Sequence, residues 1–124
     1  MTINWRDYCK GKGIALRDGG VEVQFESGRR QQVTIEDGED AIIMRSVAAR
    51  AAIVRDIPDA PLTAWLRNRS STLVGFRVDN RGRMVGEVAV PKVGLTVSEF
   101  QLVLRHLAAE VDRFEFQLSG LDQE

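Results

Sequence analysis

The chain has few of the residues from which small catalytic or cross-linked domains are built. Its 124 residues include one cysteine, Cys9, and one histidine, His106. A single cysteine excludes a disulfide framework and is typical of a reducing compartment. A zinc site needs three or four ligands, which Cys9 and His106 cannot supply. We therefore expect no metal and no cofactor.

Long apolar runs and an excess of one charge are also missing. No stretch approaches the ~20 apolar residues of a membrane-spanning helix, and the first residues lack the apolar run of a signal peptide. The 17 basic and 18 acidic residues leave a net charge of −1. Neither half of the chain has the basic excess of a nucleic-acid-binding surface. We expect a cytoplasmic protein that binds neither membranes nor nucleic acids.

Motifs for catalysis and phosphate binding are absent. No GxxxxGK[ST] occurs, and no GxGxxG joins a strand to a helix, so the glycines in 11–20 are predicted to lie in turns. Cys9 would need a base to act as a nucleophile, and nothing in the sequence places His106 near it. The acidic segment 37–40 lacks the ligand spacing of a calcium loop. These observations predict a protein without enzymatic activity and without catalytic residues.

The first third of the chain predicts a short helix and two strands. Asn4 is a good N-cap for a helix that ends at the following glycines. Alternating apolar residues predict strands at 21–25 and 31–35. A two-residue turn would place Val21 opposite Thr34. We favour a turn with a left-handed Gly28, which places Val21 opposite Val33 and keeps the apolar residues on one face.

The middle of the chain contains an ambiguous segment and a helix. Residues 41–54 combine alanines, which favour helix, with many β-branched residues, and we predict one long strand. The prolines and aspartate of 58–61 are typical of a helix start. Leu62, Trp65 and Leu66 are predicted to form the buried face of this helix, which should end within 68–71.

Residues 73–90 show a hairpin pattern. A turn that pairs Asp79 with Arg83 places Phe76 opposite Gly86, so the larger ring can cover the bare glycine. The same register places Val74 opposite Val88, and every inward position is then apolar or glycine. The opposite face should be wetter.

A cluster of arginines lies near this hairpin, interrupted by one acid, Asp79. Such a cluster with Phe76 as a stacking platform would suit a nucleic acid, but the predicted register turns Phe76 inward. We therefore interpret the cluster as solvated side chains, namely Arg67, Arg69, Arg77, Arg81 and Arg83.

The last helix has the clearest pattern. Thr96 and Glu99 form a capping box, and Gly120 is predicted to end the helix. One apolar stripe at alternating spacings of three and four should pack on the sheet; its members are Phe100, Val103, Leu104, Leu107, Val111, Phe114 and Leu118. A second stripe, offset around the helix, consists of Leu102, Ala109 and Phe116, and requires another surface to cover it.

The order of elements is therefore α-β-β-β-α-β-β-α. It predicts an α+β fold in which a largely antiparallel sheet of about five strands is combined with three helices, as one domain over 1–124.

The segment 72–118 resembles the YbjN-like family, which is similar to the bacterial type III secretion chaperones of the CesT/Tir class. Two patterns carry the resemblance, "vGf.vD..G.lvge..vP" and "gLT..ef...l..la.eaDrfe". The matching positions are Val74, Gly75, Phe76, Asp79, Gly82, Gly86, Glu87, Pro91, Leu95, Thr96, Glu99, Phe100, Asp112 and Phe114.

The resemblance implies a helix–sheet–helix fold of the secretion-chaperone type, often homodimeric, that binds a peptide or partner protein and has no catalytic residues. YbjN-like proteins are linked to sensory or regulatory roles. The alternative is a regulatory domain that senses a small molecule in a pocket between the sheet and the last helix. A closed cavity would favour sensing, whereas an open groove or sheet edge would favour protein binding.

Two surfaces are candidates for these contacts. Strand 21–25 contains no proline and would offer an open edge, so we expect a peptide at Val21, Val23 and Phe25, with Trp5 beside them. In the alternative interpretation the N-terminal helix covers this strand permanently. The second stripe of the last helix is the expected dimer interface, through Leu102, Ala109 and Phe116.

Overall fold

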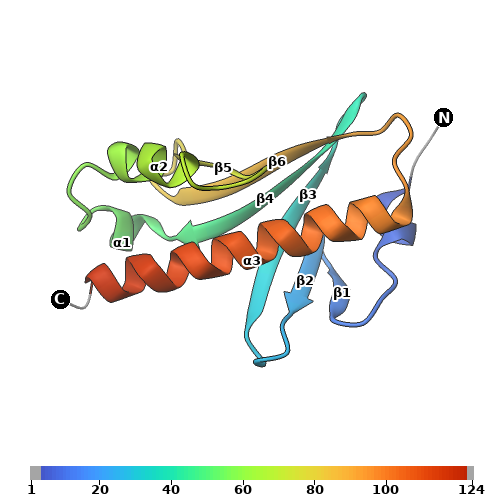
Figure 1. Ribbon diagram of the computed structural model, residues 1–124, viewed down its shortest axis with the longest axis horizontal. Helices are drawn as coiled ribbons and strands as arrows, with labels where there is room; N and C mark the ends of the chain where they lie inside the picture. Colours follow the sequence, from blue (N-terminus) through green and yellow to red (C-terminus); the bar gives the residue numbers. More distant parts are fainter. Residues whose placement is uncertain (1–3, 123–124) are drawn as a thin grey trace.

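The structure is a computed structural model in which residues 4–122 are described (Figure 1). Six strands form one antiparallel sheet in the order β1-β2-β3-β4-β6-β5. The elements are η1 (Trp5–Tyr8), β1 (Ile14–Arg17), β2 (Gly20–Gln24), β3 (Arg30–Asp37), β4 (Ala41–Ala49), α1 (Ala51–Val54), α2 (Ala60–Asn68), β5 (Gly75–Val78), β6 (Met84–Pro91) and α3 (Val97–Asp122). The predicted α+β fold is confirmed, with one more strand than expected.

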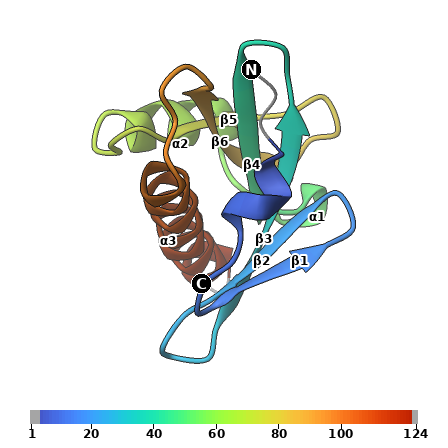
Figure 2. The same ribbon diagram turned by 90° about the vertical axis from the view of Figure 1, so that its right-hand side faces the viewer.

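Helix α3 lies along one face of the twisted sheet (Figure 2), and the core fills the space between them. Strand residues alternate between this face and the open face. On β2 and β3, Val21, Val23 and Val33 are buried in the core, whereas Glu22 and Gln32 hydrogen-bond each other on the open face at 2.7 Å. The sheet is therefore covered by helix on one side and carries polar side chains on the other.

The hairpin of β2 and β3 has the favoured register. Val21 pairs with Val33, and Gly28 adopts a φ of +90° in the turn. The Phe25 N–H donates to the Arg29 carbonyl oxygen at 2.9 Å and closes the turn. Because left-handed backbone is unfavourable for residues with a Cβ, glycine fits position 28.

Strand β1 was not predicted, and it changes the position of β2 in the sheet. Ile14 pairs with Val23 and Leu16 with Val21, so β2 has a neighbour on both sides. The expectation that strand 21–25 is an open edge is wrong. Strand β1 has four residues, lies among glycines and exposes Leu16, so it shows no clear alternation.

Strand β4 ends earlier than predicted. It stops at Ala49, where a bulge between Val47 and Ala49 disturbs its pairing with β6. The strand predicted to continue to residue 54 is wrong for 51–54, which form the helical turn α1. The high helix propensity of alanine prevails where the sheet no longer offers a partner strand.

Helix α2 begins as predicted but buries a different face. Asp59 caps it by accepting the Leu62 N–H at 3.3 Å. The small residues Ala60 and Ala64 are buried, whereas Leu62, Trp65 and Leu66 are exposed, so the predicted buried face is wrong. Alanine at the contact lets the helix backbone approach β5 closely, and the large side chains then point away from the core.

The hairpin of β5 and β6 matches the prediction around its turn. The Asp79 N–H donates to the Arg83 carbonyl oxygen at 2.8 Å, and Phe76 pairs with Gly86. A Cβ at Gly86 would lie 2.7 Å from Val111 Cγ2, so glycine is required at this crossing. Strand β5 begins after Val74, so the expected pairing of Val74 with Val88 is not part of the ladder.

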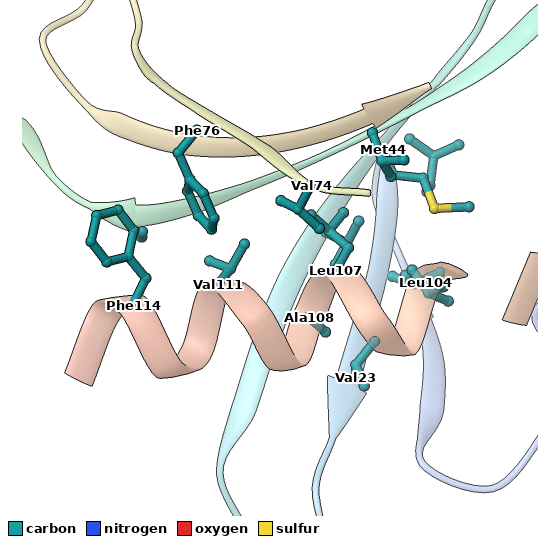
Figure 3. Packing of buried hydrophobic residues seen from close by; sticks show 14 of the residues in the cluster. Val23, Met44, Val74, Phe76, Leu104, Leu107, Ala108, Val111 and Phe114 are labelled. Carbon is teal, nitrogen blue, oxygen red and sulfur yellow. The ribbon is translucent and has the colours of Figure 1, made fainter. Parts of the chain in front are cut away.

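Helix α3 contributes one side of the core. The Glu99 N–H donates to Thr96 Oγ1 at 3.1 Å, which confirms the N-cap. The helix continues to Asp122, so the predicted end at Gly120 is wrong. The predicted core stripe is confirmed: Phe100, Leu104, Leu107, Val111, Phe114 and Leu118 are buried, with Val103 partly buried beside them. Figure 3 shows Phe114 directed toward Phe76 of β5, and the ring centroids lie 4.8 Å apart.

Candidate protein-binding surfaces

The residues predicted to bind a peptide lie mostly in the core. Val21, Val23 and Trp5 are buried, and β1 pairs along the outer side of β2. A peptide would reach these side chains only by displacing neighbouring elements. Phe25 is the exception because it is partly buried at the end of β2 and lines two surface hollows.

The two outer strands of the sheet differ in how their edges are protected. On β5, the side chain of Asn68 hydrogen-bonds both the N–H and the carbonyl oxygen of Phe76. On β1, the Gln24 N–H donates to the Gly13 carbonyl oxygen, and antiparallel alternation then directs the backbone of Leu16 outward. Arg17 covers part of this edge by donating to the Leu16 carbonyl oxygen at 2.9 Å. Strand β1 is thus a short and partly blocked edge.

The second stripe of α3 lies at the surface as predicted. Leu102 is 69% exposed and Phe116 is 65% exposed, with Ala109 half-buried between them. Seven residues separate successive members, which corresponds to ~10.5 Å along the helix. Their assignment to a dimer interface stays a prediction.

Two hollows lie beside this stripe, between α3 and the β2–β3 hairpin. The first, about 380 Å³, extends from Lys12 to Arg105, and the second, about 390 Å³, extends from Arg29 to Phe116. Phe25 lines both, and we call the two neighbouring hollows together the α3 trough. Sequence analysis missed the trough because its two walls are far apart in the chain.

A second apolar surface lies on α2. We call Leu62, Trp65 and Leu66 the α2 face; each is about half exposed. A hollow of about 320 Å³ between α2 and β5 adjoins Trp65 and is also lined by Phe76. The periodicity of the sequence showed that one side of α2 is apolar, but it could not show whether the chain itself covers that side.

His106 and Cys9, the side chains that could act as a base or a nucleophile, make contacts within the fold. His106 Nε2 lies 2.7 Å from the Thr72 carbonyl oxygen. Cys9 is buried, and its Sγ lies 3.3 Å from the Trp5 carbonyl oxygen. Burial raises the pKa of the Cys9 thiol to about 11, against a smaller opposite effect of Arg6. In the described part of the chain, no three His, Cys, Asp or Glu side chains form a group that could hold a metal ion.

Most of the arginines near the β5–β6 hairpin are ion-paired. Arg67 lies 2.8 Å from Glu110 and stacks over the rings of Phe76 and Phe114. Two further pairs are Arg77 with Glu87 at 3.2 Å and Arg83 with Asp79 at 2.8 Å, and Glu87 is shared with Arg45. Phe76 points inward as expected. Three of the five arginines are thus held by acidic side chains, as expected for structural surface charges.

The hollows described above open at the surface, as does a fourth of about 290 Å³ near Glu115 and Ala49. The space between the sheet and α3 is occupied by apolar side chains (Figure 3). This arrangement does not favour the alternative of a ligand pocket between the sheet and the last helix. None of the described helices is long and apolar enough to cross a membrane.

Comparisons with solved structures identify the class of fold. The chain matches a chain of the ExsC–ExsE complex over 84% of its length and 80% of that chain, with 13% identity and a TM-score of 0.56. It matches the HopA1–SchA chaperone–effector complex over 82% and 80%, with 13% identity and a TM-score of 0.54.

A third match is the heterodimeric ExoU–SpcU complex from the type III secretion system of Pseudomonas aeruginosa. It covers 80% of this chain and 82% of that chain, with 17% identity and a TM-score of 0.55. No protein-family model and no curated protein matches the sequence. The chain thus has the fold of type III secretion chaperones, which confirms the predicted fold, whereas its assignment to the YbjN-like family stays a prediction.

Proposed function

We propose that this chain is a non-enzymatic, chaperone-like module of the YbjN-like family that binds a segment of another protein. The main support for this proposal is the fold. At least 80% of the chain matches proteins that were solved in complexes, and one of these is a chaperone–effector complex. Binding would be noncovalent and without turnover. The cytoplasm of a bacterium is the location that suits this role.

The exposed apolar surfaces support a binding role. Large contiguous apolar areas are uncommon on proteins that act alone and are typical of interaction sites. Here exposed apolar side chains gather on α2, and others recur along α3. Two separate areas can serve two different contacts.

We further propose that the protein is a homodimer. The α2 face has the spacing of a buried helix side, yet its own chain leaves Trp65 57% exposed. A twofold dimer would bury the same surface on both copies and would explain the pattern. The hollow that Trp65 lines with residues of α2 and β5 would offer space for a side chain of the second copy.

The proposal is tested by isolating the tagged protein from its native cytoplasm and identifying co-purified proteins by mass spectrometry. The strongest candidate is then purified and mixed with the chain, and the complex is measured by light scattering and calorimetry. We expect a complex of defined stoichiometry, and a homodimer of about twice the 13.8 kDa chain mass in the absence of the partner. Failure to reconstitute any defined complex would overturn the proposal.

A further inference from the structure

The α3 trough has the form of a site for a helix. On α3 it is lined by Ala109 and Phe116, and on the opposite side by Phe25. The exposed Leu102 lines neither hollow but continues the same row toward the start of α3. Two helices that pack side by side present apolar residues at two positions in every seven, and this row supplies one of the two. The small Ala109 lies at the centre, where a second helix would approach most closely. From Leu102 to Phe116 the row is ~21 Å long, which corresponds to about four helical turns.

The charge around the trough favours an acidic ligand. Its lining contains four basic residues, Lys12, Arg29, Arg105 and Arg113, and two acidic ones, Glu26 and Asp112. The net charge of the lining is therefore +2, although the whole chain carries −1. This local excess is opposite in sign to the charge of the protein as a whole.

Two of these cations are free to contact a ligand. Asp112 is already paired with Arg29 at 3.0 Å. Lys12 and Arg105 form no ion pair with any residue of 4–122; Arg105 donates to the Lys12 carbonyl oxygen at 3.0 Å. Both line the first hollow together with one acid, Glu26, so the net charge of that hollow is +1. A carboxylate of a ligand would find unpaired positive charge there.

The same charges disfavour a second copy of this chain as the occupant. Two α3 helices packed antiparallel about a twofold axis at Ala109 would place Leu102 of one copy opposite Phe116 of the other. The same axis would place Arg105 opposite Arg113 of the second copy. Like charges at such positions oppose association, and the pairing of Arg113 with Glu110 at 3.6 Å offsets part of this repulsion. A parallel arrangement would also place each cation next to its own equivalent.

We propose that the α3 trough binds an acidic amphipathic helix of a partner protein, whose apolar side packs on Leu102, Ala109 and Phe116 and whose carboxylates contact Arg105 and Lys12. This inference rests on the proposed function and specifies the surface and the chemistry of the partner. Helix-in-groove binding draws its affinity from the apolar anchors and its specificity from the flanking charges.

The test uses two synthetic peptides that differ only in charge. Both are fluorescein-labelled helices of three heptads with leucine at the two core positions; the remaining positions carry glutamate and alanine in one peptide and lysine and alanine in the other. Binding is measured by fluorescence anisotropy. We expect the glutamate peptide to bind at least about tenfold more tightly than the lysine peptide, with a difference that shrinks at high salt because screening weakens exposed charge contacts.

Variants of the protein assign the binding to the trough. Phe116→Asp and Arg105→Glu should each weaken the glutamate peptide about tenfold or more, and Arg105→Glu should improve the lysine peptide. Val93→Asp and Arg81→Glu are the matched controls because Val93 is 94% exposed and neither residue lines the trough. The controls should bind like wild type, and thermal melts should show that all variants are folded.

Several results would overturn the inference. Equal binding of the two peptides would remove the role of charge, and unchanged binding by Phe116→Asp would place the site elsewhere. A glutamate peptide with a central proline that binds equally well would exclude a helix. Conversion of a wild-type dimer to a monomer by Phe116→Asp would show that a second copy occupies the trough.

The natural partner separates this inference from the proposed function. If a partner forms a defined complex that neither Phe116→Asp nor Arg105→Glu weakens, the proposed function stands and the trough is not the site. If the chain forms no defined complex with any protein, the proposed function fails. The anisotropy measurements then decide by themselves whether the trough binds an acidic helix.

Discussion

The side chain of Asn68 binds the backbone of Phe76 at the edge of the sheet, where a neighbouring strand would otherwise pair. Asn68 Nδ2 donates to the Phe76 carbonyl oxygen at 2.9 Å, and Asn68 Oδ1 accepts the Phe76 N–H at 2.6 Å. A single side chain at the end of α2 therefore satisfies both outward backbone groups of one β5 residue. This contact also fixes α2 against β5, with the α2 face directed away from the core.

Replacing Asn68 should destabilise the protein. Asn68→Ala leaves the Phe76 N–H and carbonyl without these partners and should lower the free energy of unfolding by about 1–3 kcal/mol. Asn68→Asp can still accept from the N–H but repels the carbonyl, so its effect should be intermediate. Urea unfolding gives the energies, and hydrogen exchange of the Phe76 amide reports the local effect. Asn80→Ala, in the exposed β5–β6 turn, is the control and should be close to neutral.

Gly86 should not tolerate a methyl group. The added Cβ would lie 2.7 Å from Val111 Cγ2 and 2.9 Å from Phe76 Cε1, inside van der Waals contact. Overpacking of this kind costs about 1–3 kcal/mol, so Gly86→Ala should lower the urea midpoint by a corresponding amount. Gly75→Ala, on the neighbouring strand, meets no atom within 4 Å and should have little effect. Equal destabilisation by both substitutions would contradict the crossing geometry.

Two phenylalanines of α3 should differ sharply in their contribution to stability. Phe114 is 4% exposed and packs on Phe76, whereas Phe116 is 65% exposed. Phe114→Ala should cost about 3–5 kcal/mol. Phe116→Ala, and likewise Leu102→Ala, should cost much less in a monomer. Similar losses for Phe114→Ala and Phe116→Ala in urea melts of dilute protein would mean that a partner copy buries the second stripe.

Strong local patterns allowed most of the fold to be predicted. The alternation on β2 and β3, the turn at Gly28 and the pairing of Phe76 with Gly86 each follow from short-range rules that the structure obeys. Strand β1 has four residues and little alternation, so only its pairing with β2 defines it. The composition of residues 51–54 is compatible with strand and with helix. They form a helix because β4 ends at Ala49 and the sheet does not continue beyond it.

The candidate sites were harder to predict than the fold. Periodicity identified Leu102, Ala109 and Phe116 as a surplus apolar row, and the structure places this row at the surface. The wall formed by Phe25 and the cations of the trough come from distant segments, so no local pattern shows them together. The α2 face was predicted to be buried because amphipathic spacing identifies the apolar side of a helix. The spacing does not show whether the same chain or another molecule covers that side.

Asp79 should make stability depend on pH in the acidic range. Burial alone would raise the pKa of Asp79. Hydrogen bonds from the backbone and guanidinium of Arg83 and from the Arg81 N–H have a larger, opposite effect, so the pKa is lowered from its ordinary 3.8. The unfolded chain therefore takes up a proton first as the pH falls. The stabilisation by Asp79 is complete above pH 3.8 and disappears as the pH falls through the lowered folded-state value.

Asp79→Asn tests this dependence. The amide keeps an acceptor for the backbone but loses the ion pair with Arg83, so the variant should be less stable than wild type by about 1 kcal/mol at neutral pH. Urea unfolding from neutral pH to below 3.8 should show the two proteins converging. Asp40→Asn, in the exposed β3–β4 turn, serves as the control. A constant difference at all pH values would show that the effect does not depend on ionisation.

Cys9 should be unreactive in the folded protein. Its buried thiol has a pKa of about 11 instead of 9.0, mainly because burial disfavours the thiolate, so near pH 8 the thiolate fraction is about a hundredfold lower than that of an ordinary cysteine. Alkylation by iodoacetamide should therefore be slow in buffer and should increase with urea in parallel with unfolding, with glutathione as the reference thiol. Because the unfolded chain ionises first, stability should fall as the pH rises above 9.0, and Cys9→Ala should remove that slope. Rapid alkylation without urea would show that η1 opens readily from α3, and would contradict its place in the core.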